Sequence, residues 1–219
     1  MAAIGQSMRR SALGLAIFAV ITAGPIAVTQ VLTEERIVQQ VRKAEAAALF
    51  EIIPESRHDN DLLSDTVPLQ PEPLLGLRKP AQAWIAREDG KPVGIILPVV
   101  ARNGYSGDIR LLVGVDTRGE ILGVRVTSHR ETPGLGDRIE LRKSDWIKSF
   151  NGRSLGNPER EDWAVAKDNG VFDQFTGATI TPRAVVQAVR DALIYFRENR
   201  QSLLDHRSTD TERSLANGN

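Results

Sequence analysis

The 219-residue sequence contains no cysteine, and this absence excludes several classes of protein at once. A chain without thiols cannot form disulfides, bind an iron–sulfur cluster through its own cysteines, build a thiolate zinc site or attach a c-type haem in the ordinary way. Only three histidines are present, His58, His129 and His206, and they lie far apart in the sequence. We therefore expect no metal site, and any redox chemistry must come from a cofactor that needs no sulfur ligand.

An excess of either charge is also missing. The sequence has 28 basic and 28 acidic residues, which gives a formal net charge of zero. Binding nucleic acid through counterion release requires a concentrated basic surface, so we expect no nucleic acid as a partner. No Gly-x-Gly-x-x-Gly motif follows a predicted strand, and we therefore expect no direct binding of NAD.

Charged residues are absent from one long stretch, 11–33, which follows Arg9 and Arg10. A helix of this length would span about 34 Å, and the hydrocarbon core of a membrane is about 30 Å thick. We predict a single transmembrane helix over 11–33. A cleaved secretory signal is the alternative, because a basic start followed by an apolar run fits it too. The length of the run, and the lack of a clear Ala-x-Ala site at its end, favour a retained anchor.

The charges on either side of the predicted span indicate its orientation. Arg9 and Arg10 precede it, whereas Glu34 and Glu35 follow it. By the positive-inside rule, residues 1–10 form a cytoplasmic N-terminus and the remaining residues lie on the far side, in the periplasm of a bacterium. We therefore expect a single-pass protein of the bacterial inner membrane, with the lipid bilayer as one of its partners.

The next segment, 34–80, combines a predicted amphipathic helix with a proline-rich connection. Apolar residues recur at helical spacing from Glu34 to Ile53, and the pattern ends before Pro54. This helix either extends the anchor or packs on the domain that follows. Five prolines fall between residues 54 and 80, which indicates a connection rich in loops.

Residues 81–204 form the predicted folded domain. Two β-hairpins are indicated by paired apolar segments around turns rich in Asp and Gly, at 82–87 with 93–100 and at 109–115 with 121–127. Short helical segments are predicted at 137–142 and 144–150, and a further strand at 163–166. The predicted fold class is α+β, with a single N-terminal transmembrane helix followed by a mainly antiparallel sheet with flanking helices.

A long helix completes this domain. Thr181 and Pro182 are predicted as its N-cap and its first helical residue. An apolar stripe then recurs at helical spacing, at Val185, Val189, Ala192, Leu193 and Phe196. Residues 205–219 are too polar to pack, and we expect a disordered tail.

Two short motifs bear on function, and the first lies directly before this helix. It covers residues 173–181, with the sequence DQFTGATIT. Small and hydroxyl residues at a helix N-terminus suit a phosphate, because unpaired amide groups point outward there and the helix dipole favours an anion. Thr, Gly and Ala also precede many helices that bind nothing, so this motif alone leaves both interpretations open.

The second motif covers residues 129–136, with the sequence HRETPGLG, and follows the strand predicted at 121–127. A rigid Pro-Gly turn with a second glycine two residues later lets the backbone pass close to a flat ligand. An ordinary turn between a strand and a helix would use the same residues. His129 by itself is more typical of a hydrogen-bonded structural residue than of a catalytic one.

In this order, behind an N-terminal anchor, the motifs resemble those of one family, the G subunit of the Rnf electron-transport complex, called Rsx in some bacteria. The resemblance extends from the anchor to about Leu204. Residues 176–179 match the family's [Ser/Thr]-Gly-Ala-Thr flavinylation motif, Asp173 takes the place of its upstream Asp, and 131–136 match its second segment without a break. Only Gln174-Phe175 depart mildly from the pattern. The C subunit of the sodium-translocating NADH:quinone reductase shares this flavin-binding domain, but the short chain fits the Rnf family better.

This resemblance implies a domain that carries FMN covalently. Thr179 would hold the flavin through a phosphoester, and a separate flavin transferase would supply FMN from FAD with Mg²⁺. Residues around 176–180 would surround the phosphate, whereas Glu131, Thr132 and Leu135 would lie near the ring or the ribityl chain. The implied cofactor-binding residues are Thr179, Thr176, Gly177, Ala178, Ile180, Asp173, Glu131, Thr132, Leu135 and Gly136.

The implied function is electron transfer within a larger assembly. The complex would pass electrons between ferredoxin and NAD and couple them to the movement of Na⁺ or H⁺, with this subunit as a relay at the periplasmic face. Its partners would be the other subunits of the complex. No catalytic residue is expected, because such a subunit is not a complete enzyme. The alternatives are the C subunit of the quinone reductase and a membrane-anchored assembly module without a cofactor.

Overall fold

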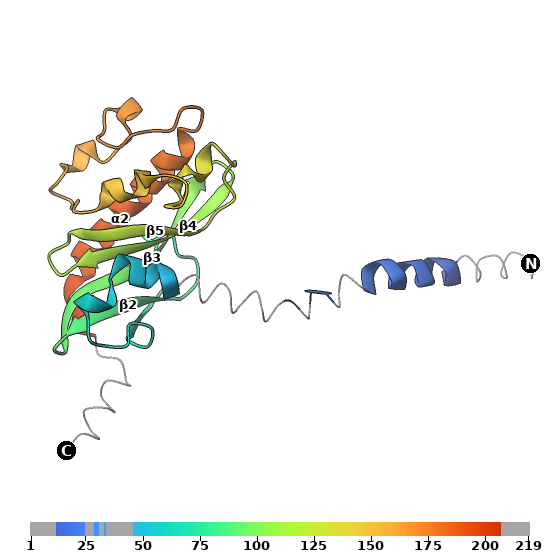
Figure 1. Ribbon diagram of the computed structural model, residues 1–219, viewed down its shortest axis with the longest axis horizontal. Helices are drawn as coiled ribbons and strands as arrows, with labels where there is room; N and C mark the ends of the chain where they lie inside the picture. The colour runs from blue at the N-terminus through green and yellow to red at the C-terminus, as the bar shows by residue number, and fades with distance from the viewer. Residues whose placement is uncertain (1–11, 25–28, 31–32, 34–45, 207–219) are drawn as a thin grey trace, which may run out of the picture. The chain divides into compact units, whose positions relative to one another are not determined.

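The computed structural model describes residues 12–24, 29–30, 33 and 46–206. The chain divides into two units, Met1–Glu45 and Ala46–Asn219, and each is considered by itself (Figure 1). The predicted cytoplasmic segment 1–10, most of the helix predicted from Glu34 to Ile53 and nearly all of the predicted tail 205–219 lie outside the described residues.

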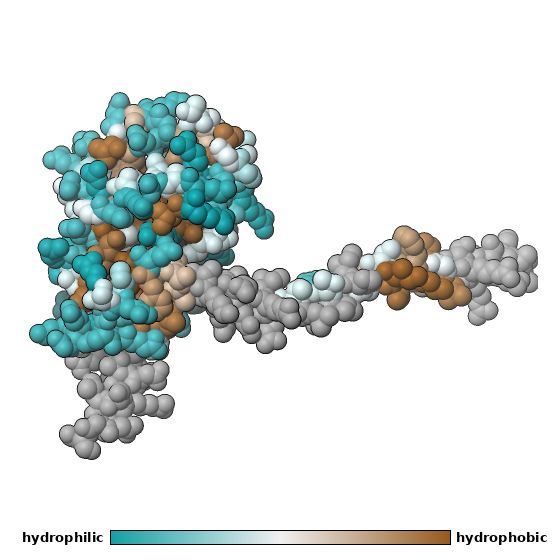
Figure 2. Space-filling model, in the orientation of Figure 1, coloured by the Kyte–Doolittle hydropathy of each residue, from teal (hydrophilic) through white to brown (hydrophobic). Residues whose placement is uncertain are grey.

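In the first unit, residues 12–24 form a helix with exposed apolar side chains. Figure 2 shows hydrophobic residues over much of the visible face of this segment. None of the helices within the described ranges combines the length and the apolar character that a membrane crossing requires. The predicted span, 11–33, extends beyond this helix into residues that the structure does not describe.

The second unit is built on a five-stranded antiparallel sheet, in which each strand pairs with the next along the chain. The strands are β1 (Thr66–Leu69), β2 (Ala81–Glu88), β3 (Lys91–Gly104), β4 (Gly107–Asp116) and β5 (Ile121–Ser128). Both predicted hairpins and the mainly antiparallel α+β class are confirmed. Strand β1 lies within the segment for which the sequence predicts loops, at the edge of the sheet, where a strand tolerates Pro68.

The turn between β2 and β3 follows from two residues. Asp89 and Gly90 have φ values of 50° and 71°. A two-residue turn that joins antiparallel strands requires positive φ at both positions, and Asp-Gly is one of the pairs that adopt it readily. This short turn sets the register that pairs Glu88 with Lys91.

Both faces of the sheet are apolar and covered. On β4, Leu111 and Val113 belong to the core under the long helix α2 (Ile180–Leu204), whereas the intervening Leu112 packs with the helix formed by residues 46–52. Such alternation places successive side chains on opposite faces. Figure 1 shows α2 on one side of the sheet and the helix of residues 46–52 on the other.

Helix 46–52 lies close to the sheet because two glycines leave room for it. Gly114 on β4 pairs with Gly123 on β5, and Ile52 packs over both. A Cβ atom at Gly114 would lie 2.1 Å from Cγ2 of Ile52. Arg125 adds a hydrogen bond of 2.7 Å from Nε to Glu51 Oε2. This described part of the predicted amphipathic helix therefore packs on the domain.

The remaining elements are short 3₁₀ helices. They are η1 (Glu55–Arg57), η2 (Gly136–Ile139), η3 (Asp145–Phe150), η4 (Arg160–Asp162) and η5 (Ala166–Asp168). The helical segments predicted at 137–142 and 144–150 correspond to η2 and η3. The strand predicted at 163–166 is wrong, since Val165 forms only an isolated bridge with Phe172. The apolar pattern arises because Trp163 packs with Phe150 and Phe172 in the core, so burial does not depend on a strand here.

Helix α2 begins earlier than predicted. Its first residue is Ile180 and its N-cap position is Thr179, whereas the sequence predicts Thr181 and Pro182 in these roles. Pro182 is tolerated because it lies in the first turn, where its missing N–H group has no partner to lose. The predicted apolar stripe is confirmed, since Val185, Val189, Ala192, Leu193 and Phe196 are all buried.

Candidate functional site

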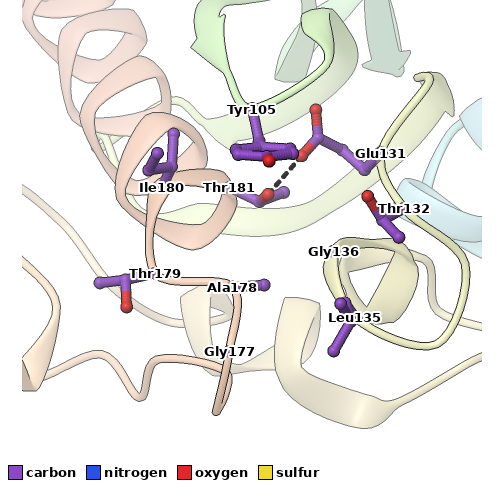
Figure 3. Close-up of a pocket in the computed structure, with 10 residues that line it drawn as sticks. All are labelled: Tyr105, Glu131, Thr132, Leu135, Gly136, Gly177, Ala178, Thr179, Ile180 and Thr181. Atoms are coloured by element: carbon purple, nitrogen blue, oxygen red, sulfur yellow. Dashed lines mark hydrogen bonds between the residues drawn. The ribbon is translucent and has the colours of Figure 1, made fainter.

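The two motifs of the sequence meet at one cavity of about 300 Å³ (Figure 3). Three segments form its walls: the turn between β3 and β4, the loop before η2, and the start of α2. The lining residues are Tyr105, Glu131, Thr132, Leu135, Gly136, Gly177, Ala178, Thr179, Ile180 and Thr181. Segments that are distant in the sequence therefore contribute to the same site. The volume of the cavity lies at the lower end of ordinary ligand pockets, roughly 300–1,000 Å³.

Eight of the ten residues singled out in the sequence line this cavity. Thr176 and Asp173 do not. Both are exposed, and the backbone carbonyl of Asp173 accepts a hydrogen bond of 2.8 Å from Nε1 of Trp146. Asp173 therefore contributes to the structure of the loop that leads into the cavity.

That loop is held by Phe175, one of the two residues that depart from the family pattern. Phe175 is buried, meets Trp146 edge to face with ring centroids 5.1 Å apart, and lies under the guanidinium of Arg138. Gly177 follows with φ of 83°, and the amide of Ala178 then donates to the carbonyl of Phe175 over 3.1 Å. The aromatic residue thus fixes a tight turn, which directs the chain into α2.

Thr179 occupies the N-cap position of α2, but its side chain makes no capping hydrogen bond. Inside a helix, the first amide groups have no carbonyl partner, and this applies to Ile180 and Thr181. Pro182 has no amide hydrogen. The result is a half-buried threonine followed by two backbone donors, at the positive end of a 25-residue helix. Such an arrangement suits an anionic group.

The opposite wall is a compact turn. The carbonyl of Thr132 accepts hydrogen bonds from the amides of Leu135 and Gly136, at 3.1 and 3.0 Å. Gly134 has φ of 77°, and its amide donates to Oδ1 of the buried Asp137 over 2.8 Å. These bonds hold Leu135 at the surface of the cavity, on the side away from Thr179 in Figure 3.

Glu131 lies deeper than expected. Its carboxylate accepts a hydrogen bond of 2.9 Å from the amide of Ser106 and another from the hydroxyl of Thr181, and only 4% of the residue is exposed. It lines the cavity, but both of its oxygens are engaged with the protein. The resemblance places this residue near the ring or the ribityl chain, whereas its contacts tie the three walls of the cavity together.

His129 holds this loop through hydrogen bonds to Glu131 and Glu140. Its Nδ1 accepts the amide hydrogen of Glu131 over 3.0 Å, and its Nε2 lies 2.8 Å from Oε1 of Glu140. Because Nδ1 is an acceptor, the ring proton of the neutral form must reside on Nε2 and point to Glu140. Burial raises the pKa of Glu140, but hydrogen bonds from Arg142 and His129 outweigh this effect and lower the pKa below its ordinary value. His129 is structural, as the sequence indicated.

Tyr105 is a lining residue that the sequence motifs do not include. It lies in the turn between β3 and β4, is 68% exposed, and borders the cavity beside Glu131 (Figure 3). Among residues 46–206, five large apolar side chains are exposed, and three of them line this cavity: Tyr105, Leu135 and Ile180. The only available signal was an aromatic residue between two glycines, Gly104 and Gly107. Exposed apolar side chains that gather at one cavity mark a binding site.

The site thus combines an apolar rim with a helix end that suits an anion, and the sequence comparison agrees with it. Residues 104–194 match the family model described as FMN-binding domain, and residues 1–52 match the RnfG N-terminal region. The class is therefore that of proteins with an FMN-binding domain behind this N-terminal region.

Whole-length relatives identify the family more narrowly. The chain is 52% identical over 203 residues to the G subunit of the ion-translocating oxidoreductase complex of Pseudomonas aeruginosa strain PAO1, which covers 93% of this chain and 95% of the relative. The G subunits of Shewanella piezotolerans and Vibrio vulnificus are 46% and 47% identical, with 91% of this chain and 94% of each relative covered. The chain belongs to the family of G subunits of the ion-translocating oxidoreductase complex. The resemblance drawn from the motifs is confirmed.

Proposed function

We propose that this protein is an electron-carrying flavoprotein subunit that holds FMN through a phosphoester to Thr179. The observation that carries the proposal is Thr179 at the start of α2, whose hydroxyl makes no capping bond and which lines the same cavity as the exposed apolar side chains. A threonine at an N-cap normally bonds to the first turn of its helix. Here that bond is missing, and the hydroxyl is available to a ligand.

The residues present fit both ends of FMN. The phosphate would lie at the start of α2, where the amides of Ile180 and Thr181 and the helix dipole favour a negative charge. The flat ring would contact Tyr105 and Leu135, which otherwise expose apolar surface to water. When bound, the flavin supplies the electron transfer, and the protein binds it, orients it and excludes water from one side.

Attachment would form one bond and break another. The Oγ1 atom of Thr179 would attack the FMN phosphorus of FAD. The bond between that phosphorus and the bridging oxygen would break, AMP would leave, and the hydroxyl proton would pass to solvent. A flavin transferase with Mg²⁺ would perform this step. Among the described residues that line the cavity, the carboxylate is that of Glu131, and both of its oxygens already accept hydrogen bonds from Ser106 and Thr181. It is therefore not placed as a general base for Thr179. A covalent link also prevents loss of FMN to a dilute outer compartment.

We further propose that the domain faces the periplasm behind a membrane anchor. This rests on the uncharged stretch 11–33, on the exposed apolar helix of residues 12–24 and on Arg9 and Arg10 before them. The other subunits of the complex and the bilayer would be its partners. The complex would exchange electrons between ferredoxin and NAD and couple them to ion movement. Similarity to the G subunits over nearly the whole length supports this function over that of the C subunit of the quinone reductase.

Coexpression with a flavin transferase tests the attachment. The unaltered protein should give a fluorescent band after denaturing electrophoresis, and its intact mass should rise by one FMN less one water. Thr179→Val should abolish both signals, because it removes the hydroxyl and preserves the shape of the side chain. Thr127→Val, at an exposed threonine on β5, is the matched control and should retain them. A protein that keeps its native fold and gains no flavin would instead favour the cofactor-free assembly module.

A further inference from the structure

Glu131 connects three segments that are distant in the sequence. It belongs to the loop before η2, accepts the amide hydrogen of Ser106 in the turn between β3 and β4, and accepts the hydroxyl hydrogen of Thr181 in the first turn of α2. Only 4% of Glu131 and 1% of Thr181 are exposed. Figure 3 shows the carboxylate turned toward Thr181 and away from Leu135.

Neighbouring glycines reserve the space for this carboxylate. A Cβ atom at Gly104 would lie 2.9 Å from Oε1 of Glu131, and one at Gly136 would lie 2.9 Å from both Cβ of Glu131 and Oγ1 of Thr181. Real Cβ atoms do not approach other atoms so closely. Glu131 and Thr181 therefore occupy space that the backbone leaves open at Gly104 and Gly136. The close backbone on both sides limits where the two side chains can lie.

The pair also lies where α2 begins. If Thr181 capped the helix, as its sequence predicts, its hydroxyl would accept an amide of the first turn. Instead it donates to Glu131, and the helix extends back to Ile180, with a bond of 3.3 Å from the amide of Arg183 to the carbonyl of Thr179.

Thr179 is consequently held in a helical conformation, with φ of −78° and ψ of −29°. A capping residue normally has an extended backbone, which lets its side chain turn back to the first amides. In the observed conformation the hydroxyl of Thr179 does not cap the helix. The carboxylate of Glu131 accepts its hydrogen bond from the side chain of Thr181 and not from the backbone of α2. The amides of Ile180 and Thr181 therefore remain available to a second anion.

We propose that Glu131 is a positioning residue for flavin attachment: by binding the hydroxyl of Thr181 it sets the first turn of α2, and this keeps the hydroxyl of Thr179 from capping the helix. The proposal rests on Thr179 being the attachment site. Glu131 does not touch the reacting atoms in this role. It acts through Thr181 on the geometry of Thr179, the residue that accepts the flavin. This role concerns the first turn of α2 and no later part of the helix.

A pair of substitutions at Thr181 separates this role from general stability. Thr181→Val keeps the shape and removes the hydroxyl, whereas Thr181→Ser keeps the hydroxyl. With purified apo-protein, FAD, Mg²⁺ and flavin transferase, Thr181→Val should lower the initial rate of covalent FMN incorporation by at least about tenfold, because a hydrogen bond to a charged group is lost. Thr181→Ser should remain within about threefold of the unaltered protein, since its hydroxyl can still donate to Glu131.

Two further measurements distinguish positioning from loss of fold. Ile96→Val, in the core on the far face of the sheet, weakens packing without touching the site and should load FMN at the unaltered rate. Glu131→Leu should slow loading at least as much as Thr181→Val, because it removes the bond from Ser106 as well as the bond from Thr181. The double variant should be no slower than Glu131→Leu alone, because that variant already lacks the bond to Thr181. Hydrogen exchange at the amide of Arg183 in the apo-protein should accelerate in Thr181→Val and not in Thr181→Ser.

The outcomes are separable. Rapid loading of Thr181→Val, or unchanged exchange at Arg183 in that variant, would overturn the positioning role while leaving attachment at Thr179 intact. If the unaltered protein takes up no flavin, or if Thr179→Val still does, the proposed function fails. In that case the exchange at Arg183 still decides whether Glu131 and Thr181 set the start of α2.

Discussion

Two glycines in one loop should respond to alanine for opposite reasons. Gly136 has no positive φ, but a Cβ atom there would lie 2.9 Å from Cβ of Glu131 and 2.9 Å from Oγ1 of Thr181, and 3.1 Å from Oε2 of Glu131. Gly134 has φ of 77°, and a Cβ atom there would meet nothing within 4 Å. Gly136→Ala therefore introduces overlap in a buried pair, whereas Gly134→Ala introduces only backbone strain.

The expected magnitudes follow from these distances. Overpacking a buried site costs about 1–3 kcal/mol, and a non-glycine residue in the left-handed region costs about 1–2 kcal/mol. A domain of this size loses roughly 2–4 °C in melting temperature per kcal/mol. Both alanine variants should therefore melt lower than the unaltered protein, by up to about 12 °C for Gly136→Ala. Only Gly136→Ala should also slow FMN loading, because it alone displaces Glu131 and Thr181.

Asparagine separates the two causes. It tolerates positive φ, so Gly134→Asn should recover most of the stability that Gly134→Ala loses, whereas Gly136→Asn should be at least as harmful as Gly136→Ala. Thermal unfolding followed by circular dichroism, with FMN loading measured on the same samples, provides the test. If Gly136→Ala melts and loads like the unaltered protein, Gly136 does not pack tightly against Glu131 and Thr181, and the reasoning is refuted.

Three other predictions concern stability and the cavity rim. Glu140→Gln should lower the free energy of unfolding at neutral pH, because the folded state lowers the pKa of this carboxylate. The difference in stability from the unaltered protein should vanish as the pH falls from 4.5 through the lower pKa of the folded state. Equal urea midpoints at pH 7 would contradict this prediction. Gly114→Val should destabilise the domain by about 1–3 kcal/mol, because the new side chain overlaps Ile52. The loss should be smaller when Gly114→Val is made in an Ile52→Ala background. If the two substitutions lower the urea midpoint by independent, additive amounts, that contact is not the cause. Tyr105→Ala should change the free energy of unfolding by no more than about 0.5 kcal/mol, since the side chain is exposed. The same substitution should increase the quenching of flavin fluorescence by iodide, because it uncovers the ring. Unchanged quenching would show that Tyr105 does not contact the flavin ring.

The sheet and most of the site could be predicted from the sequence because their signals are local. Asp89 and Gly90 define a tight turn, and alternation along β4 separates the two faces of the sheet. The glycines and threonines of the two motifs mark places where backbone approaches a ligand. Their convergence at one cavity depends on the order of the strands, which the structure shows.

The errors have non-local causes. Thr181 has the sequence of an N-cap, but a glutamate 50 residues earlier engages its hydroxyl and moves the helix start to Ile180. Trp163 and Val165 have the apolar pattern of a strand because Phe150 and Phe172 cover them. Tyr105 becomes part of the site only through the folding of a hairpin against α2. None of these partners is visible within a short window of sequence.

The most direct test of the central claim is the location of the flavin on the chain. Trypsin cleaves after Lys167 and Arg183, and the peptide between them contains three threonines, Thr176, Thr179 and Thr181. After coexpression with a flavin transferase, fragmentation of this peptide should place one FMN, less one water, on Thr179 alone. An unmodified peptide from a protein that was otherwise competent for loading, or a flavin on Thr176 or Thr181, would contradict the central claim.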